Sequence, residues 1–149
     1  MFQMCNIASN VGTEELSHLE IVGAIVQQLT DGLSPEEIKA AGFEQYYVDH
    51  TLGIWPQAAG GVPQNACQFQ SKGDPITDLF EDMAAEQKAR STYDNILRMV
   101  KDPAVCDVIK FLRSREIVHF QRFGEGLRLV QDDLDSRNFY AVNPAFDVK

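Results

Sequence analysis

The chain has 149 residues and a formal net charge of −9, from 13 Lys and Arg against 22 Asp and Glu, and this length allows one domain with a buried core. The acidity, without any Lys/Arg patch, argues against nucleic acid and against a polybasic membrane anchor. No apolar run approaches the ~20 residues of a membrane span, and Met1 to Cys5 lack the basic and apolar regions of a secretory signal, so we expect a protein made in the cytoplasm that does not enter a membrane.

The first predicted element is a long helix over about residues 3–30. Apolar residues recur in it at helical spacing, namely Leu16, Leu19, Val22, Val26 and Leu29. We expect Asp31 and Gly32 to end this helix, because glycine readily adopts the left-handed conformation that follows a helix C-terminus.

A short second helix is predicted to begin at Ser34 and to stop near Gly42. Its serine N-cap, the proline that follows and Glu37 together form the pattern of a capping box. The next stretch, residues 43–73, is interrupted by glycine and proline and has no regular period. Roughly thirty residues without regular structure are long for a loop in a compact domain, which favours a functional or interface-forming segment.

Two long helices are predicted over about residues 75–102 and 103–135. Each starts with aspartate followed by proline, the pattern of an N-cap with proline at the first helical position. We therefore predict an all-α fold with three long helices, a short helix and a long loop in a helical domain of residues 1–135. Residues 136–149 form a C-terminal tail, which we expect to pack on its own domain or on another subunit through apolar residues, namely Phe139, Tyr140, Val142 and Phe146.

The two long helices carry charged residues at positions that should face their shared core. Alternating steps of four and three give Leu79, Met83, Glu86, Arg90, Tyr93, Leu97 and Val100 in the first, and Val105, Ile109, Leu112, Glu116, His119, Phe123, Gly126 and Val130 in the second. Glu86, Glu116 and His119 therefore lie on the seam that should be most apolar. A carboxylate buried without a partner costs several kcal/mol or becomes protonated, so such a core usually holds a cation. Arg90, one turn after Glu86, is either a partner of that carboxylate or part of a structural ion pair.

The motif Glu-x-x-His occurs twice, as Glu15 with His18 and as Glu116 with His119. Side chains three residues apart on a helix point the same way about one turn apart. A single such motif is usually a solvated pair, but two of them with Glu86 from another helix form the ligand set of di-metal carboxylate bundles. Carboxylate and imidazole ligands suit manganese or iron. The three cysteines show no CxxC pairing, which argues against zinc, an iron–sulfur cluster or a disulfide framework.

Five segments of the chain carry longer motifs, namely GTEELSHLE at 12–20, AAGGVP at 58–63, KGDPITDL at 72–79, DMAAEQKAR at 82–90 and FLRSREIVHFQRF at 111–123. With these motifs in this order, the chain resembles the manganese catalases over about residues 6–135. It most closely resembles their short spore-coat members of the CotJC type. The resemblance implies a ferritin-like four-helix bundle with two manganese ions, which cycle between the two-Mn(II) and two-Mn(III) states. It also implies that hydrogen peroxide is disproportionated to water and dioxygen, and that the protein is located in the spore coat.

The resemblance assigns roles to the inward-facing residues. By position, Glu15 corresponds to the carboxylate that bridges both metals, His18 ligates one metal, and Glu86 and His119 ligate the other. Glu116 corresponds to a catalytic carboxylate that is hydrogen-bonded to metal-bound solvent and carries protons during turnover. The residues alone leave open whether Glu116 is a ligand or a base, and the resemblance favours the base.

The chain differs from the family pattern at its beginning. In the family, a whole helix precedes the first Glu-x-x-His helix and supplies a further glutamate to the metal that takes His18, whereas fourteen residues precede Glu15 here. Glu14 cannot substitute, because it points about 100° away from Glu15 on the helix. The chain is thus expected to be truncated at its N-terminus relative to the family. Either the missing helix was lost by truncation, or another chain donates it, or the protein is a degenerate relative. We expect the open side to be filled by a partner subunit or to make the isolated chain prone to association.

Three functions follow from these patterns and from the resemblance. The first is a di-manganese catalase acting on hydrogen peroxide, which we expect to assemble as a homo-oligomer that covers its open core. The second is a structural spore-coat protein with weak or no catalysis, bound to other coat proteins. The third is a ferritin-like oxidase with two iron ions, because the same side chains bind iron.

Overall fold

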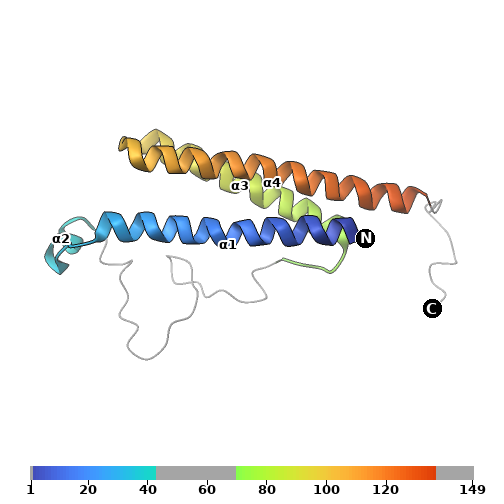
Figure 1. The fold of residues 1–149 in the computed structure, drawn as a ribbon, viewed down its shortest axis with the longest axis horizontal. Helices are drawn as coiled ribbons and strands as arrows, with labels where there is room; N and C mark the ends of the chain where they lie inside the picture. Colours follow the sequence, from blue (N-terminus) through green and yellow to red (C-terminus); the bar gives the residue numbers. More distant parts are fainter. Residues whose placement is uncertain (1, 43–69, 137–149) are drawn as a thin grey trace, which may run out of the picture. The chain divides into compact units, whose positions relative to one another are not determined.

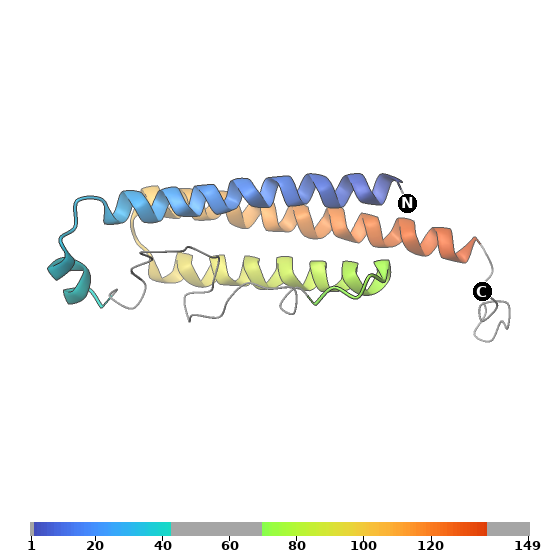
Figure 2. The same cartoon turned by 90° about the horizontal axis from the view of Figure 1, so that it is seen from below.

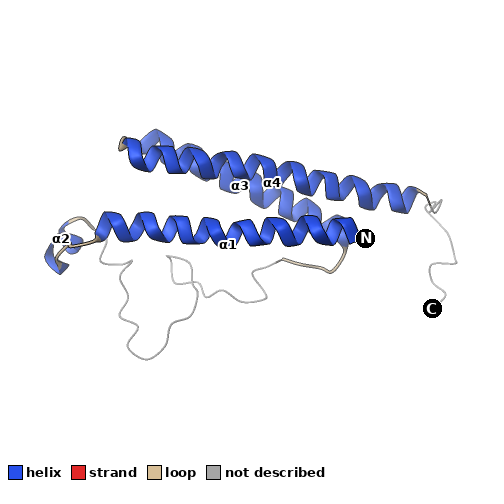
Figure 3. Cartoon of the chain, viewed as in Figure 1, coloured by secondary structure: helices blue, strands red, loops and turns tan. Residues whose placement is uncertain are grey.

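The computed structural model describes residues 2–42 and 70–136 (Figure 1). These residues form four helices, namely α1 (Phe2–Thr30), α2 (Pro35–Ala40), α3 (Pro75–Met99) and α4 (Pro103–Asp135). No strand occurs in the described part of the chain (Figure 3), which confirms the predicted all-α fold of three long helices and one short one. Most of the predicted loop and tail, residues 43–69 and 137–149, lies outside the described residues, so the proposed division into a domain and a tail stays a prediction.

Local capping interactions start the helices at the predicted residues. The Asp74 carboxylate accepts a hydrogen bond from the backbone N–H of Thr77 at 2.8 Å, and Asp102 accepts from two backbone N–H groups in the first turn of α4. The capping box of α2 also forms, with Ser34 Oγ accepting from the Glu37 N–H at 3.2 Å and Glu37 Oε2 accepting from the Ser34 N–H at 2.8 Å. Each cap satisfies backbone donors that have no partner within the helix.

The chain divides into two compact units, residues 1–19 with 71–149 and residues 20–70. In the first unit, α3 and α4 pack side by side in antiparallel directions (Figures 1 and 2). A three-residue connection, 100–102, joins them. A core cluster links both helices to the first half of α1 and consists of Val11, Leu79, Phe123 and Leu127, with Met4, Ile76, Met83 and Val130 packed against it.

Helix α4 provides most of the buried side chains of the first unit. Its buried residues are Ile109, Leu112, Glu116, His119, Phe123, Gly126 and Leu127, most of them at the predicted seam positions. On α3 only Leu79 and Glu86 are buried. Arg90 donates hydrogen bonds to Gln87 and Asp94, which confirms the interpretation of Arg90 as part of a structural ion pair.

In the second unit the described residues comprise the end of α1, the turn after it and α2. Gly32 adopts φ of +76°, the left-handed conformation that was predicted to end α1. The apolar side chains Val22, Val26 and Leu29 at this end of α1 are exposed. None of the helices in the described segments is long and apolar enough to cross a membrane.

Candidate metal centre

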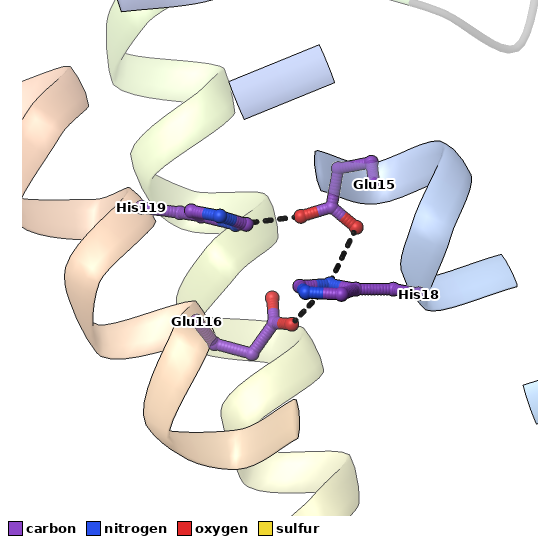
Figure 4. Close-up of side chains that lie close together, drawn as sticks. All are labelled: Glu15, His18, Glu116 and His119. Atoms are coloured by element: carbon purple, nitrogen blue, oxygen red, sulfur yellow. Dashed lines mark ion pairs between the residues drawn. The ribbon is translucent and has the colours of Figure 1, made fainter. Parts of the chain in front are cut away.

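Both Glu-x-x-His motifs meet in the first unit (Figure 4). Glu15 and His18 come from α1, and Glu116 and His119 come from α4, and one ligand atom of each lies within 4.8 Å of the others. The two imidazole rings are stacked, with centroids 5.3 Å apart and planes inclined by 19°. His18, Glu116 and His119 are buried, His119 completely. Residues about one hundred positions apart in the sequence thus form one buried group of donors.

The Glu15 carboxylate lies between the two histidines (Figure 4). Its Oε2 atom is 3.3 Å from Nδ1 of His18, and its Oε1 atom is 2.6 Å from Nδ1 of His119. Glu116 approaches the first ring, with Oε1 3.4 Å from Nδ1 of His18. The Nδ1 atoms of both rings therefore face the carboxylates, and a metal ion would meet this edge of each ring.

Glu86 adds a third carboxylate from α3. It is buried, and its Oε2 atom lies 3.7 Å from Nδ1 of His119. Burial raises the pKa of Glu86 to about 9, together with a hydrogen bond to Glu116 and the charges of Glu116 and Glu15. Burial and the charges of the same carboxylates also raise the pKa of Tyr93. The structure thus brings all five predicted site residues together in a region that disfavours further negative charge.

Three buried polar atoms of this cluster lack a hydrogen-bond partner, namely Glu15 Oε1, His18 Nδ1 and His119 Nδ1. The short contact between Glu15 and His119 does not have the alignment of a hydrogen bond. Buried polar groups are nearly always paired. Three unpaired atoms in one cluster therefore indicate a site for a partner that accepts lone pairs. Two imidazole nitrogens with carboxylate oxygens are a donor set for manganese or iron. Both described cysteines, Cys5 and Cys106, are free and stand outside the cluster. The residues present therefore fit a metal ion of this kind.

Glu14 contacts the opposite edge of the His119 ring, a role that the sequence did not predict. Its Oε2 atom is hydrogen-bonded to Nε2 of His119 at 2.9 Å and accepts from Nη2 of Arg115 at 2.6 Å, and its Oε1 atom accepts from Nη1 of Arg122 at 3.0 Å. The hydrogen bonds from His119 and Arg115 lower the pKa of Glu14 to about 2. The placement of Arg115 and Arg122 one turn before and after His119 on one face of α4 is the sequence signal that would have indicated an acidic partner here.

Comparisons with known proteins show the family of the chain. The sequence profile of the family described as "Manganese containing catalase" matches residues 3–138. Protein CotJC of Bacillus subtilis (strain 168) is 40% identical over 138 residues, which cover 93% of this chain and 73% of that protein.

Proteins named as manganese catalases are also similar to the chain. A probable manganese catalase of Clostridium acetobutylicum is 32% identical over 130 residues, which cover 87% of this chain and 58% of that protein. The manganese catalase of Lactiplantibacillus plantarum is 27% identical over 151 residues, covering 94% of this chain and 54% of that protein. The chain thus spans little more than half the length of these two relatives, and no solved structure gives a significant match. With its family profile, its helical fold and its paired Glu-x-x-His motifs, the chain belongs to the manganese catalase family, whose fold is a ferritin-like helical bundle.

Proposed function

We propose that this protein is a catalase that uses two manganese ions to convert two molecules of hydrogen peroxide into two of water and one of dioxygen. One observation carries the proposal: Glu15, His18, Glu116 and His119 converge from α1 and α4 with unpaired donor atoms. The names of two relatives, a manganese catalase and a probable manganese catalase, support both the metal and the reaction.

The described side chains suggest how two ions would be held. Glu15 lies between the two rings, so it would bridge the ions, while His18 would ligate one ion and Glu86 with His119 the other. When bound, the metal pair supplies two-electron redox chemistry, so that one peroxide is reduced and the next is oxidised. The chain itself keeps the donors in place and, by burying His18, Glu86 and His119, limits their contact with water.

Glu116 is the proposed base. It is buried, approaches His18 Nδ1 and shares a hydrogen bond with Glu86, so a proton can be held between these two carboxyl groups. In our proposal, Glu116 takes a proton from the incoming peroxide and returns it to the departing hydroxide, which leaves as water, and this avoids the separation of charge inside the bundle.

A structural role in the spore coat is a second candidate function. The 40% identity to CotJC favours it, and so do Leu16 and Leu19, whose exposed fractions of 69% and 71% leave apolar surface for an assembly partner. In this alternative the metal site stabilises the fold, and peroxide turnover is weak or absent.

Metal content and oxygen evolution test the proposal. The full chain is expressed with both manganese and iron supplied, its bound metals are measured, and oxygen release is followed after peroxide is added. We expect bound manganese and one dioxygen for every two peroxides consumed. Glu15→Ala should lose both metal and activity, whereas Glu116→Gln should keep the metal and slow oxygen release at least ~100-fold, the usual scale of a lost general base. Glu20→Gln, at an exposed position of α1, is the matched control and should behave as the unmodified chain.

The other outcomes discriminate between the candidates. Manganese binding without oxygen release favours the structural coat protein, and bound iron with no manganese favours the di-iron oxidase. Loss of metal in Glu116→Gln would identify Glu116 as a ligand rather than a base. Metal at trace level only in the unmodified chain would contradict the metal site itself.

A further inference from the structure

The Glu14 carboxylate connects α1 to α4 directly beside the metal cluster. Both of its oxygens are used: Oε2 accepts from Nε and Nη2 of Arg115, at 3.2 and 2.6 Å, and Oε1 accepts from Nη1 of Arg122 at 3.0 Å. The same Oε2 atom lies 2.9 Å from Nε2 of His119. All three partners are on α4, at positions 115, 119 and 122, so that each is about one helical turn from the next.

The contact with Glu14 determines which nitrogen of His119 carries the proton. A carboxylate oxygen in a hydrogen bond with an imidazole nitrogen accepts, so Nε2 must be the protonated nitrogen. In the neutral ring this leaves the lone pair on Nδ1, which faces Glu15 Oε1 at 2.6 Å and Glu86 Oε2 at 3.7 Å. The ring edge that faces the metal cluster is therefore the one able to bind a metal.

Two arginines hold the Glu14 carboxylate in this position. Arg115 and Arg122 fix the carboxylate from two sides, and planar guanidinium groups hold a carboxylate with defined geometry. Because these guanidinium groups hold both oxygens of Glu14, Oε2 stays in place as the acceptor of the Nε2–H group of His119. Since Glu15 and His18 follow Glu14 on α1, the same contacts also fix how the two Glu-x-x-His motifs face each other.

His18 provides an internal comparison. Its Nδ1 atom faces Glu15 and Glu116 at 3.3 and 3.4 Å, but among the described residues no carboxylate contacts its Nε2 atom. Within the described residues the two rings therefore differ: His119 has a carboxylate at both of its nitrogens, whereas His18 has carboxylates at Nδ1 alone.

We propose that Glu14 is a positioning residue, held by Arg115 and Arg122, that keeps the proton on Nε2 of His119 and directs Nδ1 of that ring toward the metal ions. The metal part of this inference depends on the proposed function, and the proton part does not. Carboxylates behind a metal-binding histidine commonly fix its tautomer and its orientation, and their loss typically weakens metal binding 10–100-fold.

The proton position is tested on the metal-free full chain. Long-range ¹H–¹⁵N spectra of the histidine side chains at about pH 8 report which ring nitrogen is protonated, and the chain has only three histidines to assign. We expect His119 to carry its proton on Nε2. In Glu14→Ala no described carboxylate faces Nε2, so the proton should move to Nδ1, the nitrogen that faces the carboxylates of Glu15 and Glu86. Glu14→Gln keeps an acceptor oxygen and should keep the Nε2 proton, and Glu20→Ala on the exposed side of α1 should change nothing.

Binding of Mn²⁺ alone to the same proteins is the second measurement. We expect Glu14→Ala to weaken it 10–100-fold, Glu14→Gln to weaken it less, and Glu20→Ala to leave it unchanged. The inference is overturned if Glu14→Ala keeps the Nε2 proton or binds Mn²⁺ as tightly as the unmodified chain. If Glu14→Ala does not fold, Glu14→Gln and Arg122→Gln replace it. The inference is supported if His119 keeps its Nε2 proton in Glu14→Gln and Mn²⁺ binding is weaker in Arg122→Gln. It is overturned if both variants bind Mn²⁺ as tightly as the unmodified chain. An unmodified chain that binds no Mn²⁺ refutes the proposed function, while the tautomer of His119 still tests the role of Glu14.

Discussion

At the scale of single residues, Glu86 has the most perturbed carboxyl group of the cluster. Its burial, its hydrogen bond to Glu116 and the charges of Glu116 and Glu15 raise its pKa to about 9 from an ordinary value of 4.5. In the metal-free protein the group is therefore protonated at neutral pH when the chain is folded, but ionised when it is unfolded. A bound cation would reverse this preference by offsetting the negative charge.

This difference predicts how the stability of the metal-free protein depends on pH. Between about pH 4.5 and 9 the folded state holds one more proton at Glu86 than the unfolded state, so this group lowers the free energy of unfolding as the pH rises. Glu86→Gln removes the contribution. Denaturant titrations between about pH 5 and 8, a range that lies inside this window, should show that Glu86→Gln gains stability relative to the unmodified metal-free chain as the pH rises. A difference that stays constant over this range would contradict the raised pKa.

The sequence predicted the residues of the candidate site, but it did not predict the residues that contact them from outside the cluster. Glu15, His18, Glu116 and His119 were found because each pair obeys a three-residue spacing that one helix imposes. Glu14 was considered only as a replacement ligand and set aside, because its direction on the helix differs from that of Glu15. Its actual partners are Arg115, His119 and Arg122 on another helix. The spacing of Arg115 and Arg122 indicates an acidic partner, but which acidic residue pairs with them depends on how the two helices pack, and a single sequence does not contain that.

At the scale of elements, α4 packs closely at Gly126. A Cβ atom placed on this buried glycine would lie 3.5 Å from Cδ2 of Leu79 and 3.8 Å from Cγ of Met4, which are ordinary van der Waals distances. The site therefore has room for a methyl group, although not for a larger side chain. Glycine inside a helix is less favourable than alanine by about 0.5–1 kcal/mol, because it loses more backbone freedom on folding.

Gly126→Ala is therefore expected to stabilise the protein by about 0.5–1 kcal/mol, as measured by denaturant unfolding. Gly126→Leu, in contrast, should destabilise it by about 1–3 kcal/mol, because extra carbon atoms would have to displace Leu79 and Met4. If Gly126→Ala lowers the free energy of unfolding while Gly126→Leu leaves it unchanged, the packing of α4 against α3 and α1 differs from that described.

The sequence predicted helix ends more accurately than it predicted burial. The ends depend on local contacts such as the Asp74 and Asp102 caps, which involve only residues of the first helical turn. The apolar positions of α1 show helical spacing, yet Leu16 and Leu19 are exposed whereas Val11 is buried. Spacing identifies an apolar face, but which part of it is covered depends on the rest of the fold or on a partner.

At the scale of the whole molecule, the exposed leucines of the first unit are the main feature that the fold leaves unexplained. Leu16 and Leu19 lie on α1 beside the site residues Glu15 and His18, and about seventy per cent of each leucine is accessible. Neighbouring exposed leucines on one helix face are typical of surfaces that contact another chain. The homo-oligomer expected from the sequence stays a prediction, for which this face is a candidate contact.

We expect the full chain to self-associate through this face. In sedimentation velocity the unmodified chain should show a species larger than a monomer, and the double variant Leu16→Gln/Leu19→Gln should shift it toward the monomer. Within one chain both side chains face solvent, so the double substitution should leave the helix content of the monomer unchanged. The same change at Phe80, an exposed apolar residue of α3, is the control. Identical sedimentation of all three proteins would contradict the assembly face on α1.

In the proposed catalase, α1 and α4 bring two Glu-x-x-His motifs together around a pair of manganese ions. Low-temperature EPR of the Mn²⁺-loaded full chain, with the manganese content measured on the same sample, tests this site most directly. We predict two manganese ions per chain and the spectrum of a spin-coupled pair, lost in both Glu15→Ala and His119→Ala. A single uncoupled Mn²⁺ signal, or an intact coupled pair in either variant, would contradict the claim.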